Sequence, residues 1–355
     1  MRVIIDIGHP AHVHYFKNLT IILQEEGYKI LFTCRQKDII SELLEKFRFK
    51  YIPLGKSRRS IPGKIFGILL FDLKLLKHAI SSKPDLFLSA GSIYAAHVSF
   101  VMHKPHITLE DTFNMEQVNL YLPFTSVVFT GCYPHKNLGS KEIQYKGFQE
   151  LTYLHPKYFS ADKTVRDELS LTVEDKYFIV RFVSWEASHD IGRRGLTNQQ
   201  KLEILKLLEK YGKVFVSAEG CLPSEFQRYI FPLPPDRMHH ALAFAHLYVG
   251  EGATMASECA MLGTTAVYIN SNEAGSIDEQ ENFGLIYHFR SPANMLEKIR
   301  QLAEDPFLKE KSRMYRNSLI EGTIDLTAFL VWVVKYWPES LRILKENPEY
   351  QERFK

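Results

Sequence analysis

The chain has 355 residues, 45% of them hydrophobic and 24% charged, a composition typical of a globular protein with enough chain for two or three domains. Its formal net charge of +3 is too small to indicate a nucleic-acid partner. The four cysteines, Cys34, Cys132, Cys221 and Cys259, have no paired spacing, which argues against a disulfide framework or a zinc site and for a reducing compartment.

The apolar segments do not have the pattern of targeting or membrane-spanning sequences. Asp6 interrupts the apolar run 3–5 before the hydrophobic region of a signal peptide could form. The runs 65–71 and 328–334 are much shorter than the ~20 residues that span a bilayer. We therefore expect a cytoplasmic protein.

The first part of the chain alternates short apolar runs with segments of helical spacing. After Gly8, for example, apolar residues recur at helical spacing over 13–23, and Gly27 is a typical helix end. Six runs are expected to be strands: 3–7, 29–33, 51–54, 86–90, 106–109 and 127–130. This alternation predicts an α/β fold with a doubly wound, Rossmann-like parallel sheet.

The second part of the chain repeats this alternation after a segment that has neither period. A polar loop is expected over 271–282, and Asp305 with Pro306 has the pattern of a helix start. Five runs are expected to be strands: 177–183, 213–217, 247–249, 265–269 and 285–289. The second half therefore also predicts a Rossmann-like domain.

These patterns predict two domains with a cleft between them. The first is expected over 1–150, completed by a C-terminal helix over 325–355 that crosses back to it. The segment 151–175 is expected to be a connector, and the second domain to cover 176–324. Ligands of such sheets bind beyond the carboxyl ends of the strands.

One βαβ pattern, LYVGEGATMASECAMLGTTAVYIN over 247–270, combines two strand-like runs with a glycine turn and a helix that ends at Gly263. The unpaired amides and the positive dipole end of a helix that starts after a glycine turn suit a phosphate group. Glu258 lies on the same side of this helix as Thr254 and can accept hydrogen bonds from sugar hydroxyls. The alternative is a capped structural helix with a solvated Glu258.

A basic turn precedes an apolar helix near the start of the chain. Lys56, Arg58, Arg59 and Lys64 are followed by the sequence IFGILLF. Such a segment could make a peripheral contact with an anionic membrane, and the alternative is a solvated loop that leads into a buried helix.

With both halves considered, the sequence resembles the GT-B superfamily and, more closely, an uncharacterised archaeal and bacterial family within it. The wider relatives are the UDP-N-acetylglucosamine 2-epimerases and the peptidoglycan N-acetylglucosamine transferase. The resemblance extends over almost the whole chain, and its local signatures are IDIGHPAHVHYFKNL, PDLFLSAGS, LEDTFNMEQVNLYLP, YKGFQELTYLHPKYF, RFVSWEASHD and MHHALAFAHLYVGEGATMASECAMLG.

In the second domain, the resemblance implies a nucleotide-sugar site. It implies that Gly252, Ala253 and Thr254 hold the diphosphate and that Glu258 binds the ribose. The segment DEQEN, over 278–282, resembles the transferase loop near the donor sugar and nominates Gln280 and Asn282, with a polar surface loop as the alternative. Arg181, at the end of a strand, could pair with a phosphate oxygen or form a structural ion pair.

In the first domain, the loop from Gly8 to His14 resembles the glycine- and histidine-containing loop of the transferase. His12 is the best general-base candidate because an imidazole titrates near neutrality, and the alternative is a capping or core histidine. Glu110 and Asp111 could hold an acceptor hydroxyl or act as a base, or one of them could cap the next helix.

The sequence departs from the epimerases at two places. Gly91 and Ser92 stand where the epimerases have an acidic residue, and no counterpart of their P-E-E-type segment is found near 120–125. We therefore expect a GT-B-type glycosyltransferase that uses a nucleotide-diphosphate sugar such as a UDP-sugar, with no cofactor and, lacking a D-x-D motif, no bound metal. The alternatives are a nucleotide-sugar epimerase or hydrolase, and a non-catalytic nucleotide-sugar-binding protein. The acceptor and the oligomeric state are left open.

Overall fold

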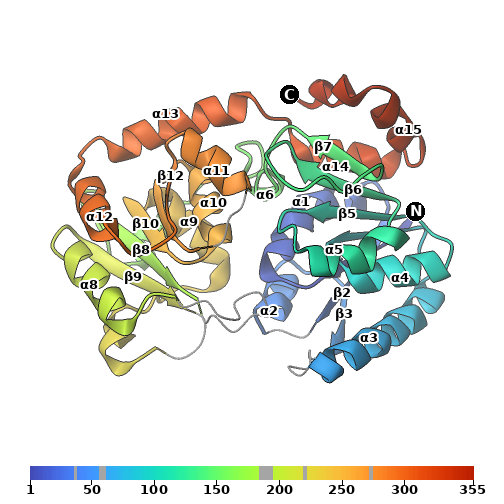
Figure 1. Ribbon diagram of the computed structural model, residues 1–355, viewed down its shortest axis with the longest axis horizontal. Helices are drawn as coiled ribbons and strands as arrows, with labels where there is room; N and C mark the ends of the chain where they lie inside the picture. The colour runs from blue at the N-terminus through green and yellow to red at the C-terminus, as the bar shows by residue number, and fades with distance from the viewer. Residues whose placement is uncertain (36–37, 56–60, 184–194, 219–221, 272–274) are drawn as a thin grey trace. The chain divides into compact units, whose positions relative to one another are not determined.

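A computed structural model describes residues 1–35, 38–55, 61–183, 195–218, 222–271 and 275–355. These residues form two units: Met1–Tyr158 together with Thr323–Lys355, and Phe159–Gly322. Each unit is built on one parallel β-sheet (Figure 1), which confirms the prediction of two Rossmann-like α/β domains. The basic residues Lys56, Arg58 and Arg59, considered above for membrane contact, lie outside the described residues.

The first unit has a seven-stranded sheet with the order β3-β2-β1-β4-β5-β6-β7. The strands are β1 (Arg2–Ile7), β2 (Lys29–Arg35), β3 (Tyr51–Gly55), β4 (Leu86–Ala90), β5 (His106–Glu110), β6 (Val127–Gly131) and β7 (Glu142–Tyr145). The first six agree with the predicted runs. The prediction missed β7, because this edge strand has only four residues, EIQY, of which two are buried.

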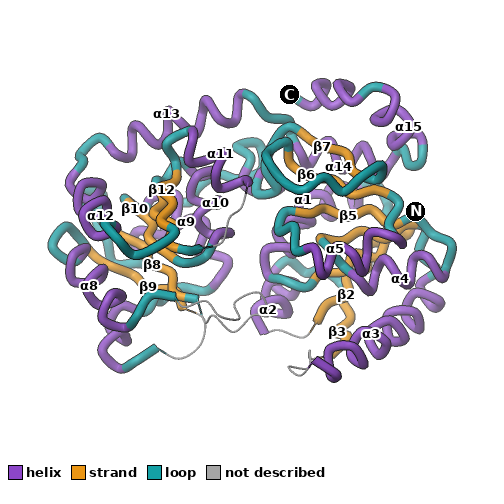
Figure 2. The backbone as a smooth tube through the Cα atoms, in the orientation of Figure 1, coloured by secondary structure: helices purple, strands orange, loops and turns teal. Residues whose placement is uncertain are grey.

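Helices cover both faces of this sheet, as the coloured tube in Figure 2 shows. The helices are α1 (Pro10–Glu25), α2 (Asp38–Lys46), α3 (Ile61–Ser82), α4 (Ile93–Val101), α5 (Met115–Tyr121) and α14 (Leu326–Lys335). On one face, Ile4 and Phe87 pack against Leu75 of α3 and Val98 of α4. Phe129 of β6 packs edge-on against Phe329 of α14, with ring centroids 5.4 Å apart.

The C-terminal segment belongs to the first unit, as predicted. After α14 it continues as α15 (Glu339–Glu346) and a 3-10 helix, η5 (Pro348–Phe354). Asp325 caps α14 by accepting from the backbone N–H of Ala328 at 2.9 Å, and its other oxygen accepts from Lys157 Nζ and Tyr158 Oη at 2.9 and 2.8 Å. A buried carboxylate therefore joins the returning helix to residues 157–158.

Among the described residues, one stretch, Leu308–Lys335, is long and apolar enough by length and composition to cross a membrane. It consists of two helices, α13 (Leu308–Glu321) and α14, and 56% of its most apolar window is buried. Since Leu326, Phe329 and Val333 are buried, packing within the first unit accounts for the apolar character of α14.

The contacts of Asp325 predict a loss of stability in Asp325→Ala. Removing the cap and leaving Tyr158 Oη without its acceptor should lower the free energy of unfolding by about 1–3 kcal/mol. Asp325→Asn keeps an acceptor for the cap and should lose less than about 1 kcal/mol, because the Lys157 side chain is 61% exposed. Urea unfolding followed by tryptophan fluorescence tests this, since Trp332 and Trp337 lie in this segment. Equal losses in both variants would contradict the role of the cap.

The second unit has a five-stranded sheet with the order β12-β11-β10-β8-β9. The strands are β8 (Tyr177–Phe182), β9 (Lys213–Ala218), β10 (Leu247–Gly250), β11 (Ala266–Ile269) and β12 (Ile286–Phe289). All five agree with the predicted runs. The short helices of the predicted connector divide between the units, α6 (Leu151–Leu154) in the first and α7 (Thr164–Glu168) in the second.

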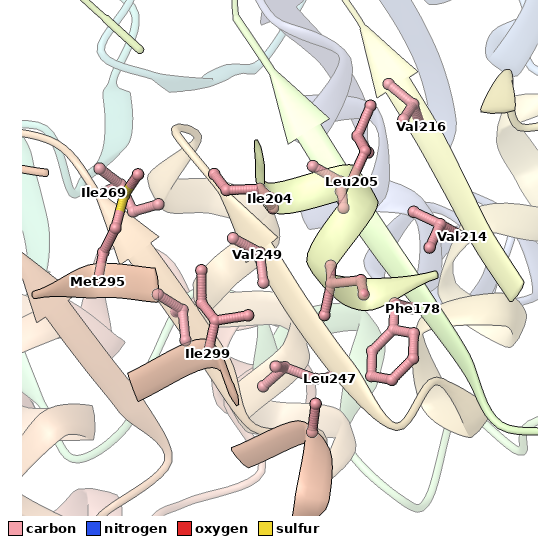
Figure 3. Packing of buried hydrophobic residues seen from close by; sticks show 14 of the residues in the cluster. Phe178, Ile204, Leu205, Val214, Val216, Leu247, Val249, Ile269, Met295 and Ile299 are labelled. Atoms are coloured by element: carbon pink, nitrogen blue, oxygen red, sulfur yellow. The ribbon is translucent and has the colours of Figure 1, made fainter. Parts of the chain in front are cut away.

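One face of the second sheet packs against α8 (Asn198–Leu208) and α12 (Met295–Glu304). Figure 3 shows side chains from the strands and from these two helices pointing toward one another. Phe178, Val249, Leu205 and Ile299 are all at most 2% exposed, so this layer forms the core of the unit. Helix α8 begins at Thr197, which forms a capping box with Gln200.

The other face carries α9 (Met238–Phe244), α10 (Ala253–Leu262), α11 (Gly275–Asn282) and α13. As predicted, α10 ends at Gly263, which has the left-handed conformation (φ 70°) of a helix C-cap. Two local predictions were wrong. The expected polar loop is largely the helix α11. The helix expected to start at Asp305 begins only at Leu308; Asp305 is the C-cap of α12, and its Oδ1 accepts from the backbone N–H of Phe307 in the turn between the two helices.

Candidate functional site

The candidate site of the second unit lies where the strand order changes direction, between β8 and β10. The two strands are parallel neighbours, and Gly250 is in register with Arg181 at their carboxyl ends. The backbone N–H of Glu251 donates to the carbonyl oxygen of Arg181 at 3.1 Å, which extends the pairing by one residue. This is the position at which open α/β sheets bind their ligands.

Helix α10 begins at this edge without a side-chain cap. Gly252 is its N-cap residue, with φ −98° and ψ 119°, and as a glycine it has no side chain to accept a hydrogen bond from the first turn. The amides of Ala253 and Thr254 therefore lie in a helix start whose dipole favours an anion. The predicted strand, glycine turn and helix are all present.

The two glycines of this turn have different steric roles. A Cβ atom on Gly250 would lie 2.9 Å from Cβ of Arg181 and would also meet the hydroxyl of the buried Tyr248. A Cβ atom on Gly252 would meet nothing closer than 3.7 Å. Close packing therefore requires a glycine at 250 and permits a small side chain at 252.

This difference predicts unequal effects for two matched substitutions. Gly250→Ala should lower the free energy of unfolding by about 1–3 kcal/mol, the usual cost of overpacking. Gly252→Ala should cost less than about 1 kcal/mol, because only N-cap preference changes. Chemical denaturation of both variants measures the difference. A larger loss in Gly252→Ala would contradict the steric argument.

Arg181 and Glu251 organise the strand ends around this turn. Arg181 Nη1 donates to Ser217 Oγ, at the end of β9, at 2.7 Å. Glu251 is only 1% exposed and accepts from the backbone N–H groups of Leu196 and Val183 at 2.7 and 3.2 Å. Sequence analysis missed Glu251. The available sequence signal was its position between Gly250 and Gly252. In the structure its buried carboxylate holds the neighbouring loops by accepting their backbone N–H groups.

Glu258 is a buried residue of α10. It is 5% exposed, and its Oε1 accepts from His239 Nε2 of α9 at 3.0 Å. The alternative of a solvated Glu258 is therefore wrong. The histidine fixes the orientation of the carboxylate about one turn from the start of α10. Sequence analysis placed His239 on a helix but gave it no role.

Gln280 and Asn282, the residues nominated for the donor sugar, have different environments. Gln280 is fully buried in α11, and its Nε2 donates to Ser257 Oγ of α10 at 2.7 Å, whereas Oε1 has no hydrogen-bond partner in the part of the chain that the structure describes. Asn282 is exposed at the end of α11. Gln280 therefore joins α11 to α10. The buried Gln280 and the exposed Asn282 do not form one common sugar-binding surface.

In the first unit, Glu110 is held by four donors. Its Oε1 accepts from Thr112 N, Thr112 Oγ1 and Phe113 N, each at 2.8 Å, and its Oε2 accepts from Tyr121 Oη at 2.5 Å. Glu110 is 4% exposed. Burial of Tyr121, reinforced by the charge of Glu110 and the hydrogen bond to it, raises the pKa of that phenol. Glu110 thus holds the turn that precedes α5, whereas the side chain that caps this helix is that of Asn114, which accepts from Glu116 N.

Asp111, the next residue, has a different environment. Its Oδ2 accepts from Tyr15 Oη at 2.9 Å, and it is partly exposed. Desolvation, reinforced by the charge of Glu110, raises the pKa of Asp111 to about 6. A carboxyl group with this pKa can accept a proton near neutral pH.

His12 and Gly8 interact within the loop that precedes α1. The backbone N–H of Gly8 donates to Nδ1 of His12 at 3.3 Å, so the neutral imidazole carries its proton on Nε2. The His12 ring stacks on Tyr15 with centroids 5.6 Å apart, and Tyr15 in turn donates to Asp111. His9 caps α1 by accepting from Ala11 N. The structure therefore brings Gly8, His12 and Asp111 together through Tyr15, which sequence analysis missed.

A buried carboxylate also joins the strand ends at the switch point of the first sheet. Asp6 accepts from Thr33 Oγ1 of β2 and from Ser92 Oγ after β4, both at 2.6 Å. Burial raises the pKa of Asp6 despite these hydrogen bonds. Ser92, which stands where the epimerases have an acidic residue, also caps α4 by accepting from Ala95 N. The position therefore has a structural use here.

Comparison with solved structures identifies the class of fold. The chain is similar to the UDP-GlcNAc 2-epimerase of Neisseria meningitidis bound to UDP-GlcNAc, with a TM-score of 0.66, 15% identity, and coverage of 90% of this chain and 100% of that one. It is also similar to a glycosyltransferase of Streptomyces sp. SF2575 complexed with thymidine diphosphate, with a TM-score of 0.63, 14% identity, and coverage of 94% and 99%. Its two parallel-sheet units have the GT-B fold.

Sequence comparison identifies the family. A family model described as "Protein of unknown function (DUF354)" matches residues 1–305, and the chain belongs to this family. The uncharacterized protein MJ0665 of Methanocaldococcus jannaschii is a distant relative, 22% identical over 292 residues that cover 78% of this chain and 83% of that protein.

Proposed function

We propose that this chain is a GT-B-type glycosyltransferase that binds a nucleotide-diphosphate sugar in its second unit. The observation that carries the proposal is the uncapped start of α10 at the switch point of the sheet, next to Arg181. Helix amides and a guanidinium can stabilise the charge that develops on a departing diphosphate without a metal ion. The solved structures of the same fold that hold UDP-GlcNAc and thymidine diphosphate support this ligand class.

We propose that the backbone amides of Ala253 and Thr254 and the guanidinium of Arg181 bind the diphosphate. Gly252, which has no side chain, leaves room for the diphosphate to approach these amides. Glu258 is proposed to bind the ribose. His239, which donates to Oε1, would orient this carboxylate toward a ribose hydroxyl. Asn282 is exposed and can contact a sugar, whereas the buried Gln280 holds α11 against α10 through its hydrogen bond to Ser257.

The proposed general base is Asp111 of the first unit. Glu110 is a poorer candidate because it is buried and already accepts four hydrogen bonds. His12 is a poorer candidate because its Nδ1 lone pair already accepts from the backbone N–H of Gly8. Asp111 is partly exposed, and its pKa is raised to about 6. Its carboxylate would remove the proton of the acceptor hydroxyl.

The second candidate function is a nucleotide-sugar epimerase or hydrolase, favoured by the similarity to the Neisseria epimerase. The identity of residue 92 argues against it, because the side chain there is a serine that caps α4 and donates to Asp6, and not the acidic residue of the epimerases. Incubating the purified chain with a donor alone separates the two functions. Consumption of the donor without an acceptor would favour the second candidate.

Binding of the donor is tested by thermal shift and calorimetry with UDP, thymidine diphosphate and their sugars. We expect saturable stabilisation by at least one nucleoside diphosphate. Glu258→Gln should weaken that binding by about 1.5–3 kcal/mol, because a hydrogen bond to a charged acceptor is lost. The amide oxygen can still accept from His239, so the melting temperature of the free protein should change little.

Glu310→Gln is the matched control, since Glu310 is an exposed residue of α13 in the same unit. Binding by the control should equal that of the unchanged protein. If no nucleotide stabilises the protein, or if both variants bind equally well, the proposed donor site is wrong.

Asp111→Asn should separate catalysis from stability through its pH dependence. Activity of the unchanged protein should rise with pH through about 6 and then level off, and the variant should lose activity at every pH. Because folding raises the pKa of Asp111 from 3.8 to about 6, the native state binds more protons between these values, so this residue lowers stability as the pH rises. At pH 7.5 the variant should therefore be more stable by about 1–2 kcal/mol, allowing for partial exposure. An unchanged pH–activity profile in the variant would exclude Asp111 as the base.

A further inference from the structure

We propose that Asp278, Glu281 and His288 form a binding site for a divalent transition-metal ion such as Zn²⁺ or Mn²⁺. Asp278 and Glu281 are one turn apart on α11, and His288 lies on the adjacent β12. One candidate ligand atom from each residue lies within 4.8 Å of the other two. The site does not depend on the proposed transferase activity, because none of these residues has a part in it.

The histidine carries the argument, because one of its ring nitrogens is buried without a partner. His288 is 9% exposed, and its Nε2 donates to the carbonyl oxygen of Asn270 at 2.8 Å. The proton is thus fixed on Nε2, which leaves Nδ1 with a lone pair, and within the described residues Nδ1 has no hydrogen-bond partner. An imidazole whose other nitrogen donates to a backbone carbonyl is the usual arrangement of a metal-binding histidine.

The carboxylates lie on the side of the histidine ring that holds this lone pair. Glu281 Oε1 accepts from the backbone N–H of His288 at 3.1 Å, and Nδ1 is the ring nitrogen nearer the main chain. Asp278 Oδ1 is also buried without a hydrogen-bond donor among the described residues, and it forms an ion pair with Arg290 Nη2 at 3.6 Å. A lone pair and a carboxylate oxygen that both lack donors are costly to bury, and a cation between them would satisfy both.

The donor set indicates the class of ion. One imidazole nitrogen with two carboxylate oxygens suits Zn²⁺, Mn²⁺ and similar ions better than Mg²⁺ or Ca²⁺, which prefer oxygen ligands alone. Ligand atoms about 2.1 Å from a tetrahedral ion are about 3.4 Å apart, so atoms that lie within 4.8 Å of one another need approach by no more than about 1.4 Å. Asp278 and Glu281 are partly exposed and can make this adjustment by rotation of their side chains.

The ion would fix α11 on the edge of the sheet and would act on the neighbouring turn through hydrogen bonds. The carbonyl oxygen of Asn270 accepts from His288, and Nδ2 of Asn270 donates to the carbonyl oxygen of Glu251 at 2.9 Å. Glu251 directly precedes Gly252, where α10 begins. We therefore assign the site a structural role, in which Asn270 connects His288 to the backbone of Glu251 in the turn before α10.

The test uses the full chain without a histidine tag, stripped of metal by a chelator and titrated with ZnCl₂, MnCl₂ or MgCl₂ in a calorimeter. We expect one saturable site for Zn²⁺, weaker binding of Mn²⁺ and no measurable binding of Mg²⁺ at equal concentration. Zn²⁺ should also raise the melting temperature, because the ion binds only the folded arrangement.

Three variants locate the ion. Asp278→Asn and His288→Ala should each weaken Zn²⁺ binding at least tenfold, and Glu310→Gln, an exposed carboxylate of α13, should leave it unchanged. Because His288→Ala also removes the bond to Asn270, Asp278→Asn provides the test if that variant does not fold. Absence of saturable Zn²⁺ binding, equal binding of Mg²⁺, or unchanged binding in Asp278→Asn would each overturn the proposal.

Discussion

In both units, every strand runs parallel to its neighbours, and this constraint determines where the chemically useful residues lie. Parallel strands end at one edge, so the loops that follow β1, β4 and β5 meet in the first unit, and those that follow β8, β10 and β11 meet in the second. Residues far apart in the sequence, such as Tyr15 and Asp111, become hydrogen-bond partners there. The apolar layers on the two faces of each sheet provide the stability that keeps these edges in register.

Buried acidic residues hold the loops at these edges. Three of these residues are at most 4% exposed: Asp6, Glu110 and Glu251. Asp6 and Glu251 each accept hydrogen bonds from two segments that are far apart in the sequence, and Glu110 accepts from the turn that follows it. A buried carboxylate is tolerated only when donors replace the lost water. Such a group therefore specifies one arrangement of its loops, whereas the neighbouring Asp111, which accepts from Tyr15, is partly exposed.

The fold could be predicted because its signals are local and repeated. Eleven of the twelve strands in the described residues follow from apolar runs bounded by glycine, proline or polar residues. The turn and helix between Gly250 and Gly263 follow from the spacing of the glycines. The missed strand, β7, is too short for its alternation to be distinctive. The helix α11 was taken for a loop because the sequence GSIDEQEN is mostly polar, and burial of Ile277 and Gln280 against α10 stabilises it instead.

The site was only partly predictable, since the sequence shows which residue types follow a strand but not which partners they meet. Glu110 and Asp111 are chemically equivalent in the sequence, and only the four donors around the first and the exposure of the second distinguish them. Likewise, the tautomer of His12 depends on the position of one backbone amide, that of Gly8. The pairing of His239 with Glu258 joins two helices and leaves no trace in local spacing.

The first unit is discontinuous, because the strands of its sheet come from residues before Tyr158 whereas α14 and α15 come after Thr323. During synthesis on the ribosome, the sheet would therefore emerge with the face around Phe129 uncovered until residues 323–355 are made. The second unit, which is contiguous in sequence, can fold in the interval. Completion of the unit that carries Asp111 thus waits for residues 323–355, and a nascent chain stalled before that segment exposes an apolar surface to chaperones.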